Sequence, residues 1–293
     1  MPEVRSPTVR RRELGGILRS LRLARGMTVE QVAEQLLCSP SKVSRMETGS
    51  RAATLRDVRD LCDLYEVKDP AERERLSKLA TEGKQQGWWQ PYELDTFATY
   101  VGLEAEATTL IDFRCTTVPG LLQTADYART MHRTAVPGFT PERIEEFVEV
   151  RLTRQRLLLQ RDSPLQLIVV IDEAMLHRVV GGPAVMAEQL DWLVESARQP
   201  SVTIRVIPLE FGAHPAMDSN FNILEFDTAP SVVYVEGLVG WIYMERPQDL
   251  ARYEEVFESL LSASLSPRES IELMSAVGAQ YKERTAELLF PYR

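Results

Sequence analysis

The residues best suited to recognition chemistry lie at positions 40–47, where polar and apolar side chains recur at helical spacing. Val43 and Met46 fall on one face of such a helix. The opposite face is polar and consists of Lys42, Ser44 and Arg45. An arginine guanidinium can donate two hydrogen bonds to the O6/N7 edge of guanine, and a serine hydroxyl can bond to any base. This polar face therefore predicts binding to DNA.

Residues that could carry catalysis are sparse. His132, His177 and His214 are far apart, and none lies in an HxxxH or HExxH spacing. Asp172 and Glu173 follow an apolar IVVI run, as carboxylates do in metal-dependent nucleases, but no lysine or third acid follows at a fitting interval. We therefore expect no enzymatic activity, no catalytic residue, no metal and no cofactor.

Two short helices must position the polar face. Thr28 and Gln31 form a capping-box sequence, which predicts a helix start at Thr28. Ser39 supplies a second N-cap, with Pro40 at the first helical position, and Gly49 predicts the end of that helix. The first helix is amphipathic through Val29, Val32, Ala33, Leu36 and Leu37.

Two helices joined by so short a turn cross steeply, and small or branched residues such as Ala33 and Val43 suit the contact between them. The N-terminal end of the second helix then points outward and can enter the major groove of DNA. The alternative is an ordinary helical hairpin with the same pattern.

The region from Arg12 to roughly Glu66 resembles the lambda-repressor-like (Cro/C1, or XRE-type) helix-turn-helix domain. The resemblance is carried by LRSLRLARGMT, VEQVAEQL, SPSKVSRMETG and TLRDVRDLCDLYEV. In that family an arginine of the first helix pairs with the glutamate that ends the recognition helix, which implies a mostly buried Arg22–Glu47 ion pair here. Removing one partner of such a pair costs roughly 3–5 kcal/mol.

The same resemblance implies the roles of individual residues on DNA. Ser41 and Arg45 match the positions that read base edges, and Pro40 would contact a thymine methyl group or nothing. The backbone amides near Thr28 and Ser39 would bind phosphate as helix N-termini do. The side chains that would face phosphates are Ser39, Lys42 and Arg51.

Charge is distributed unevenly along the 293 residues, whose net charge is −9. Residues 1–52 hold ten Lys/Arg against five Asp/Glu, so the remainder, with 24 against 38, carries −14. A basic module joined to an acidic body indicates that only the N-terminal part contacts a polyanion. Residues 1–11 are expected to be a flexible basic arm. At the end of the arm lie Arg10 and Arg11, and Arg12 follows them. These three arginines would lie along phosphates, enter a minor groove or remain solvated.

The domain boundaries follow from composition. We expect the helix-turn-helix domain over residues 12–68, a connector over residues 69–96 and a second domain over residues 97–293. The connector ends near Trp88, Trp89 and Tyr92, which could line a ligand pocket or dock the connector onto the second domain. The 44% hydrophobic content suits two globular domains.

The second domain is predicted to be α+β, with a mainly antiparallel sheet flanked by helices. Residues 99–114 show a helical pattern, whereas PLQLIVVIDE, VTIRVIPL, NFNILEF, SVVYVEG and LVGWIYM read as strands. The chain as a whole is therefore expected to be α+β, with an all-α domain of five helices at its N-terminus.

Residues 88–275 resemble the domain that follows the helix-turn-helix in actinobacterial WhiJ-like regulators. The matching segments include VGLEAEA, VPGLLQTADYAR and IDEAMLHRVVGG. The resemblance implies an antitoxin-like or developmental transcriptional repressor, often encoded beside a small partner protein.

The expected protein is a cytoplasmic DNA-binding regulator. No apolar run is long enough to span a membrane, no secretory signal is apparent, and Cys38, Cys62 and Cys115 suit a reducing compartment. Because one such domain buries little surface on DNA, we expect a homodimer on a palindromic operator, held together largely by the second domain, which would also bind a small partner protein or an effector. The alternative is an antitoxin-like protein that mainly sequesters its partner and uses DNA binding for autoregulation.

Overall fold

The computed structural model describes residues 6–92, 94, 97–135, 138–227, 229–237 and 240–289. The chain forms two compact units, Met1–Glu106 and Ala107–Arg293. Among the described helices, none combines the length and the apolar composition that crossing a bilayer requires.

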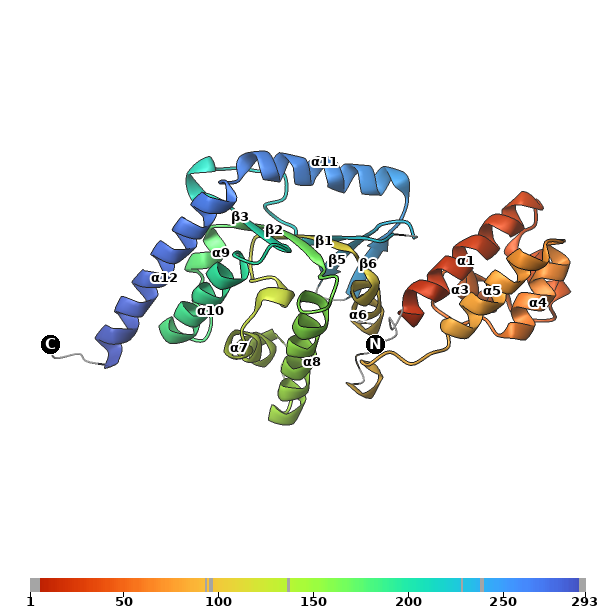
Figure 1. The fold of residues 1–293 in the computed structure, drawn as a ribbon, viewed down its shortest axis with the longest axis horizontal. Coiled ribbons are helices and arrows are strands. Elements are labelled where there is room, and N and C mark those ends of the chain that lie inside the picture. The colour runs from red at the N-terminus through yellow and green to blue at the C-terminus, as the bar shows by residue number, and fades with distance from the viewer. Residues whose placement is uncertain are drawn as a thin grey trace. The chain divides into compact units, whose positions relative to one another are not determined.

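The N-terminal unit is helical (Figure 1). Its elements are α1 (Pro7–Ala24), α2 (Val29–Gln35), α3 (Pro40–Glu47), α4 (Leu55–Leu64), α5 (Pro70–Glu82), the 3₁₀ helix η1 (Gln90–Tyr92) and α6 (Phe97–Glu106). Helices α1 to α5 share one apolar core, in which Leu18, Val32, Val58 and Leu76 are almost completely buried. The five-helix domain expected from the sequence is therefore present.

Helix α5 corrects the predicted connector. Leu76, Leu79 and Ala80 lie in the same core as α1 to α4, because α5 places them on one face that packs against α1 and α4. Residues 70–82 therefore belong to the helical domain, which extends beyond the predicted boundary at residue 68.

The start of α1 corrects the predicted arm. Pro7 occupies the first helical turn after Ser6, and Thr8, Val9 and Arg10 are buried. Residues 7–11 are thus part of a packed helix and not a flexible arm. Residues 1–5 of the predicted arm lie outside the described residues.

The C-terminal unit contains a six-stranded sheet of order β3-β2-β1-β4-β5-β6. The strands are β1 (Thr109–Arg114), β2 (Gln166–Asp172), β3 (Val202–Ile207), β4 (Phe221–Glu225), β5 (Val232–Gly237) and β6 (Gly240–Met244). Strand β2 pairs in parallel with β1 and β3, whereas the pairings β1–β4, β4–β5 and β5–β6 are antiparallel. The sheet is therefore mixed, with three antiparallel and two parallel pairings, where a mainly antiparallel sheet was expected.

Strand β1 was missed by the sequence analysis, which extended a helix to residue 114. Helix α6 ends at Glu106, and Thr109–Arg114 then pairs with β2 and β4 at the centre of the sheet. Leu110 and Ile111 suit a helical pattern, but adjacent residues of a strand also need apolar side chains when both faces of the sheet are covered.

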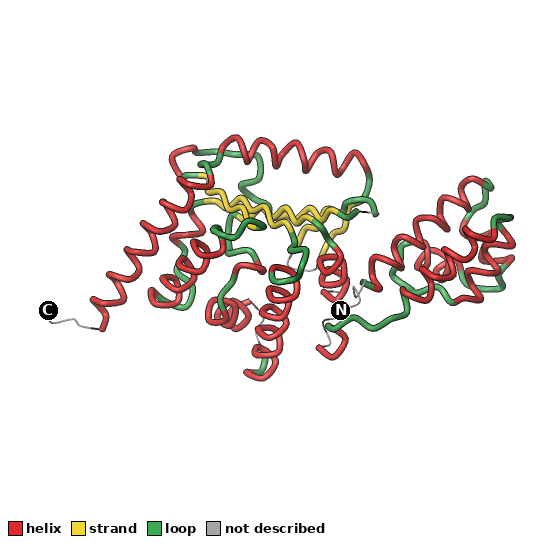
Figure 2. Tube along the Cα trace, in the orientation of Figure 1, coloured by secondary structure: helices red, strands yellow, loops and turns green. Residues whose placement is uncertain are grey.

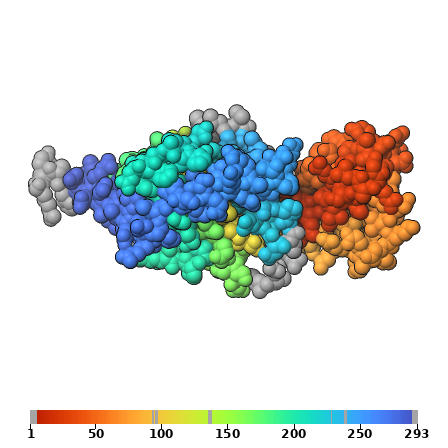
Figure 3. All heavy atoms as spheres, turned by 90° about the horizontal axis from the view of Figure 1, so that it is seen from above, coloured from red at the N-terminus to blue at the C-terminus, as the bar shows by residue number. Residues whose placement is uncertain are grey.

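Helices cover both faces of this sheet (Figures 1 and 2). The helices of the unit are α7 (Ala125–Ala135), α8 (Pro141–Leu159), α9 (Ala174–His177), α10 (Pro183–Ser196), α11 (Pro247–Ala263) and α12 (Pro267–Leu289), with 3₁₀ helices η2 (Gly120–Leu122) and η3 (Leu209–Phe211). Helix α11 lies on one face, where Phe257 and Leu260 pack against Phe113, Phe221 and Val233. Figure 3 shows α11 along the outer surface of the unit. Helices α7 to α10 lie on the other side of the sheet, and α12 packs against α10.

Candidate DNA-binding interface

The helices α2 and α3 are built as the capping residues predict. The Gln31 amide donates to Thr28 Oγ1 at 3.2 Å, and the Thr28 amide donates to Gln31 Oε1 at 2.8 Å, so the capping box is formed. The Lys42 amide donates to Ser39 Oγ at 3.2 Å at the start of α3. Gly49, with φ +69°, adopts the left-handed conformation that ends the helix.

The inner face of α3 is fixed by packing. Val43 and Met46 are 1% and 2% exposed, and Ala33 of α2, 1% exposed, lies in the same core. A larger side chain at Ala33 would meet this core directly. The orientation of the outer face therefore follows from how α3 is packed.

The outer face of α3 is exposed at most of the positions that the sequence assigned to DNA. Arg45 Nε donates to the Ser41 carbonyl oxygen one turn earlier, at 3.2 Å, so the two candidate base-reading residues lie next to each other. The assigned residues that are exposed are Thr28, Ser39, Pro40, Ser41, Ser44, Arg45 and Arg51.

The ion pair implied by the family resemblance is present. Arg22 Nε and Nη2 donate to the two carboxylate oxygens of Glu47 at 2.6 and 2.8 Å, while Nη1 donates to the Met27 carbonyl oxygen at 2.8 Å. Both side chains are nearly buried, 9% and 7% exposed. The hydrogen bonds to Glu47 raise the pKa of Arg22 against the opposing effect of burial. This bidentate pair joins α1 to the end of α3.

Lys42 differs from its expected role. Its Nζ lies 2.5 Å from Asp57 Oδ1, in the first turn of α4, and its side chain is only 25% exposed. Lys42 is thus engaged within the protein, where the sequence analysis placed it on a phosphate. The sequence did not identify Asp57 as a partner of Lys42. Its local pattern shows only that a helix begins there.

The arginines of the expected arm are also engaged within the protein. Arg10 Nη1 and Nη2 donate to Glu13 and Glu106, each at 2.8 Å, and Nε lies 3.4 Å from Glu82. Arg11 Nη2 donates to Thr8 Oγ1 at 3.1 Å, and burial lowers the pKa of Arg11.

The side chain of Arg12 packs where Gly49 ends α3, since a Cβ atom on Gly49 would lie 2.7 Å from Arg12 Cγ. Of the roles left open for the three arginines, contact with DNA and exposure to solvent are both wrong for Arg10, which is buried among carboxylates.

The aromatic residues of the predicted connector form a packed cluster. The ring centroids of Trp88 and Trp89 are 5.9 Å apart, and those of Trp88 and Tyr92 are 6.2 Å apart, both edge to face. Trp89 is 4% exposed and lies beside Gly102 of α6, where an added Cβ would stand 3.0 Å from the indole. Trp89 therefore packs within the N-terminal unit, and the choice between a ligand pocket and docking onto the second domain stays a prediction.

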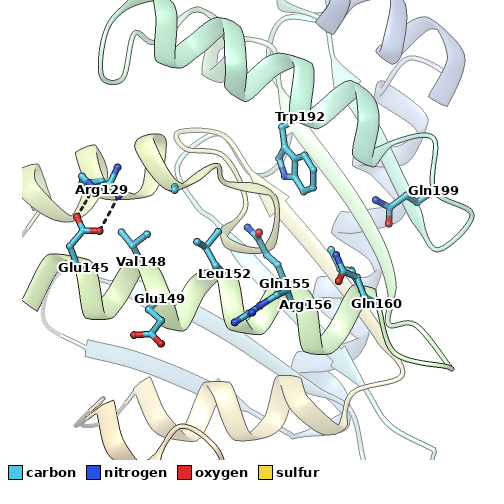
Figure 4. Close-up of a pocket in the computed structure, with 12 residues that line it drawn as sticks. Arg129, Glu145, Val148, Glu149, Leu152, Gln155, Arg156, Gln160, Trp192 and Gln199 are labelled. Carbon is cyan, nitrogen blue, oxygen red and sulfur yellow. Dashed lines mark hydrogen bonds and ion pairs between the residues drawn. The ribbon is translucent and has the colours of Figure 1, made fainter.

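The C-terminal unit holds a groove of about 610 Å³ between α7, α8 and α10 (Figure 4). Its apolar lining includes Val148, Leu152 and Trp192, whose ring projects from α10 toward α8. The Arg129–Glu145 ion pair, with Nη2 to Oε2 at 2.9 Å, lies at one end. The volume is in the range of small-molecule sites, and no sequence motif marked this groove.

Two of the histidines considered for catalysis, His177 and His214, and the two carboxylates Asp172 and Glu173 have polar partners within the protein. His214, with its side chain 1% exposed, lies 3.1 Å from Asp172 Oδ2, and its Nδ1 accepts from the Ala216 amide at 3.3 Å. Glu173 accepts from the Leu209 amide at 2.8 Å. Within the described residues, no group of three or more His, Cys, Asp or Glu is placed to hold a metal ion.

Two families match this chain. Residues 13–76 match a family described as a helix-turn-helix domain, which supports DNA binding by the N-terminal unit. Searches of curated proteins and of solved structures found no match. The finer resemblances, to lambda-repressor-like and to WhiJ-like regulators, stay predictions. Residues 97–276, more than half of the chain, match a second family, and the chain therefore belongs to the family described as "Domain of unknown function (DUF5753)".

Proposed function

We propose that this protein is a sequence-specific DNA-binding transcriptional repressor. The observation that carries the proposal is the exposed pair Ser41 and Arg45 on α3, a helix held in place by the Arg22–Glu47 ion pair. A polar helix face that is rigidly oriented and uncovered in its own unit is what major-groove readout needs.

The regulator acts as a homodimer on a palindromic operator. A single helix-turn-helix buries too little surface for tight operator binding, and two-fold symmetry doubles the contacts. Sedimentation at micromolar concentration should show a dimer, and footprinting on the DNA upstream of its own gene should show a two-fold symmetric site.

Arg45→Ala tests base reading. We expect a loss of about 1–3 kcal/mol in operator affinity, together with relaxed preference at one base pair, because a bidentate contact to guanine is removed. Arg19→Ala, at another exposed arginine, on α1, is the control and should leave base preference unchanged. Gel shifts with single-base operator variants measure both. An unchanged base preference in Arg45→Ala would overturn the assignment.

The C-terminal unit is proposed to receive the regulatory signal, as an effector or a small partner protein. The groove between α7, α8 and α10 supports an effector, because apolar side chains line it and the indole Nε1 of Trp192 is buried without a hydrogen-bond partner among the described residues. A partner protein would instead co-purify with the chain and release it from DNA. That result would favour the antitoxin-like alternative, in which operator binding serves only autoregulation.

A further inference from the structure

The contact between Lys42 and Asp57 joins the first turn of α3 to the first turn of α4. Lys42 is the third residue of α3, and its ammonium lies 2.5 Å from Asp57 Oδ1. The carboxylate is only 11% exposed, and its other oxygen accepts from the Thr54 amide at 2.9 Å and from the Thr54 hydroxyl at 2.8 Å. Asp57 is thereby held in one orientation by the cap of α4.

The carboxylate remains charged in this position. Burial raises its pKa, but the hydrogen bonds from Lys42 and Thr54 outweigh that effect and leave the pKa of Asp57 below its usual value. A charge-assisted bond to an ordered, charged acceptor is stronger than one between neutral groups. Lys42 therefore has a fixed partner in the free protein.

The location of this pair matters for DNA binding. The N-terminal end of the second helix of a helix-turn-helix lies in the major groove, flanked by the phosphates of both strands. In such a complex an ammonium in the first turn of α3 would lie within a side chain's length of those phosphates, and so would the carboxylate that it contacts. Asp57 and the DNA backbone would then compete for the same cation.

Resting on the proposed DNA-binding function, we propose that Asp57 is an intramolecular competitor of the DNA backbone. It holds Lys42 inside the protein and thereby lowers affinity for DNA of any sequence. Asp57 is a positioning residue that acts through Lys42. The contacts of Ser41 and Arg45 then carry a larger share of operator binding than they would beside a freely accessible lysine.

The proposal predicts the effect of Asp57→Asn in the full chain. Freeing Lys42 adds one phosphate contact, so the slope of log K against log[salt] should become steeper by about 0.9 for operator and random duplexes alike. The affinity advantage over the unsubstituted protein should grow about eightfold for each tenfold reduction in salt. Fluorescence anisotropy over a salt series measures both quantities.

A double-substitution cycle separates this effect from simple removal of a negative charge. With Lys42→Gln already present, Asp57→Asn should leave the salt slope nearly unchanged, because no cation remains to be released. Equal effects of Asp57→Asn with and without Lys42 would overturn the proposal. Asp63→Asn is the charge-matched control, since Asp63 lies on the same helix and pairs with Arg73 of α5 at 2.6 Å.

Stability is checked by circular dichroism for every variant. If Asp57→Asn does not fold, Asp57→Gln takes its place, because glutamine at the third position of a helix can complete a capping box without charge. A folded, unsubstituted protein that binds no operator would refute the proposed function itself. Operator binding with an unaltered salt slope in both Asp57 variants would refute only the role of Asp57.

Discussion

The backbone of Gly15 in α1 lies directly against the end of α3 at Glu47. A Cβ atom on Gly15 would stand 2.5 Å from the Glu47 carbonyl oxygen and 2.5 Å from that of Met46. Non-bonded atoms do not approach this closely, so α1 and α3 can keep their distance only if residue 15 has no side chain. The next residue, Gly16, faces open space, with nothing within 4 Å of its added Cβ.

Replacing each of these adjacent glycines by alanine should have opposite effects on the free energy of unfolding. Gly16→Ala should raise the free energy of unfolding by about 0.5–1 kcal/mol, since alanine favours a helix and meets no neighbour. Gly15→Ala should lower it by about 1–3 kcal/mol, because α1 must move away from α3. The operator affinity of Gly15→Ala should also fall, because α3 is displaced. Urea unfolding and gel shifts measure the two effects, and equal stability of both variants would contradict the close contact.

The helix-turn-helix could be predicted from the sequence because its signals are local. Thr28 and Ser39 sit immediately before the helices that they cap, and the Arg22–Glu47 pair could be placed through the family resemblance. The partners of Lys42 and Arg10 could not be predicted in this way. Asp57 and Glu106 lie 15 and 96 residues away along the chain, and only the packing of helices brings them near.

The sheet was predicted less completely for a similar reason. Five strand runs stood out as β-branched or alternating segments, but β1 continues the apolar residues of a preceding helix with only Ala107 and Thr108 between them. Its identity depends on pairing with β2 and β4, which lie about 60 and 110 residues further on. Periodicity alone does not separate a short buried strand from a helix end.

Arg10 should be a stability determinant and not a DNA contact. It lies among Glu13, Glu82 and Glu106, on α1, α5 and α6, and Arg10→Met would leave this group without its guanidinium. We expect a loss of about 3–5 kcal/mol in the free energy of unfolding. Where the variant is folded, its DNA salt slope should equal that of the unsubstituted protein.

Arg19→Met is the matched control on the exposed side of α1, and it should unfold at nearly the same urea concentration as the unsubstituted protein. If the salt slope of Arg10→Met were instead smaller by about one unit, Arg10 would contact a phosphate, as the sequence first suggested.

Leu37, in the turn between α2 and α3, should be replaceable with a gain in stability. Its φ of +50° is unfavourable for a leucine, and its side chain is 94% exposed, so it contributes little packing. Leu37→Gly should raise the free energy of unfolding by roughly 0.5–1 kcal/mol, once the greater freedom of glycine in the unfolded chain is subtracted. Leu37→Ala keeps the unfavourable φ and should give no gain. If both variants gained stability, the exposed leucine side chain and not the backbone conformation would be the cause.

His132 should make the C-terminal unit sensitive to acid. Its ring stacks on Phe147 at 5.2 Å, and Nε2 is buried without a hydrogen-bond partner among the described residues. Burial, with the positive charges of Arg151 and Arg154, lowers the pKa of His132 to about 3. The unfolded chain takes up this proton near pH 6.5, whereas the folded unit stays neutral until about pH 3.

The unfolded state therefore binds more protons below pH 6.5, and stability falls as the pH is lowered toward 3. The loss is at most about 1.4 kcal/mol per pH unit, or roughly 2 kcal/mol between pH 6.5 and 5. His132→Phe keeps an aromatic ring on Phe147 but cannot be protonated, so its unfolding free energy should fall less steeply over this range. His177→Gln removes a histidine that is 42% exposed on α9 and serves as the comparison. Urea titrations at several pH values compare the three proteins, and parallel curves for all of them would show that His132 is protonated in the folded unit as readily as in the unfolded chain.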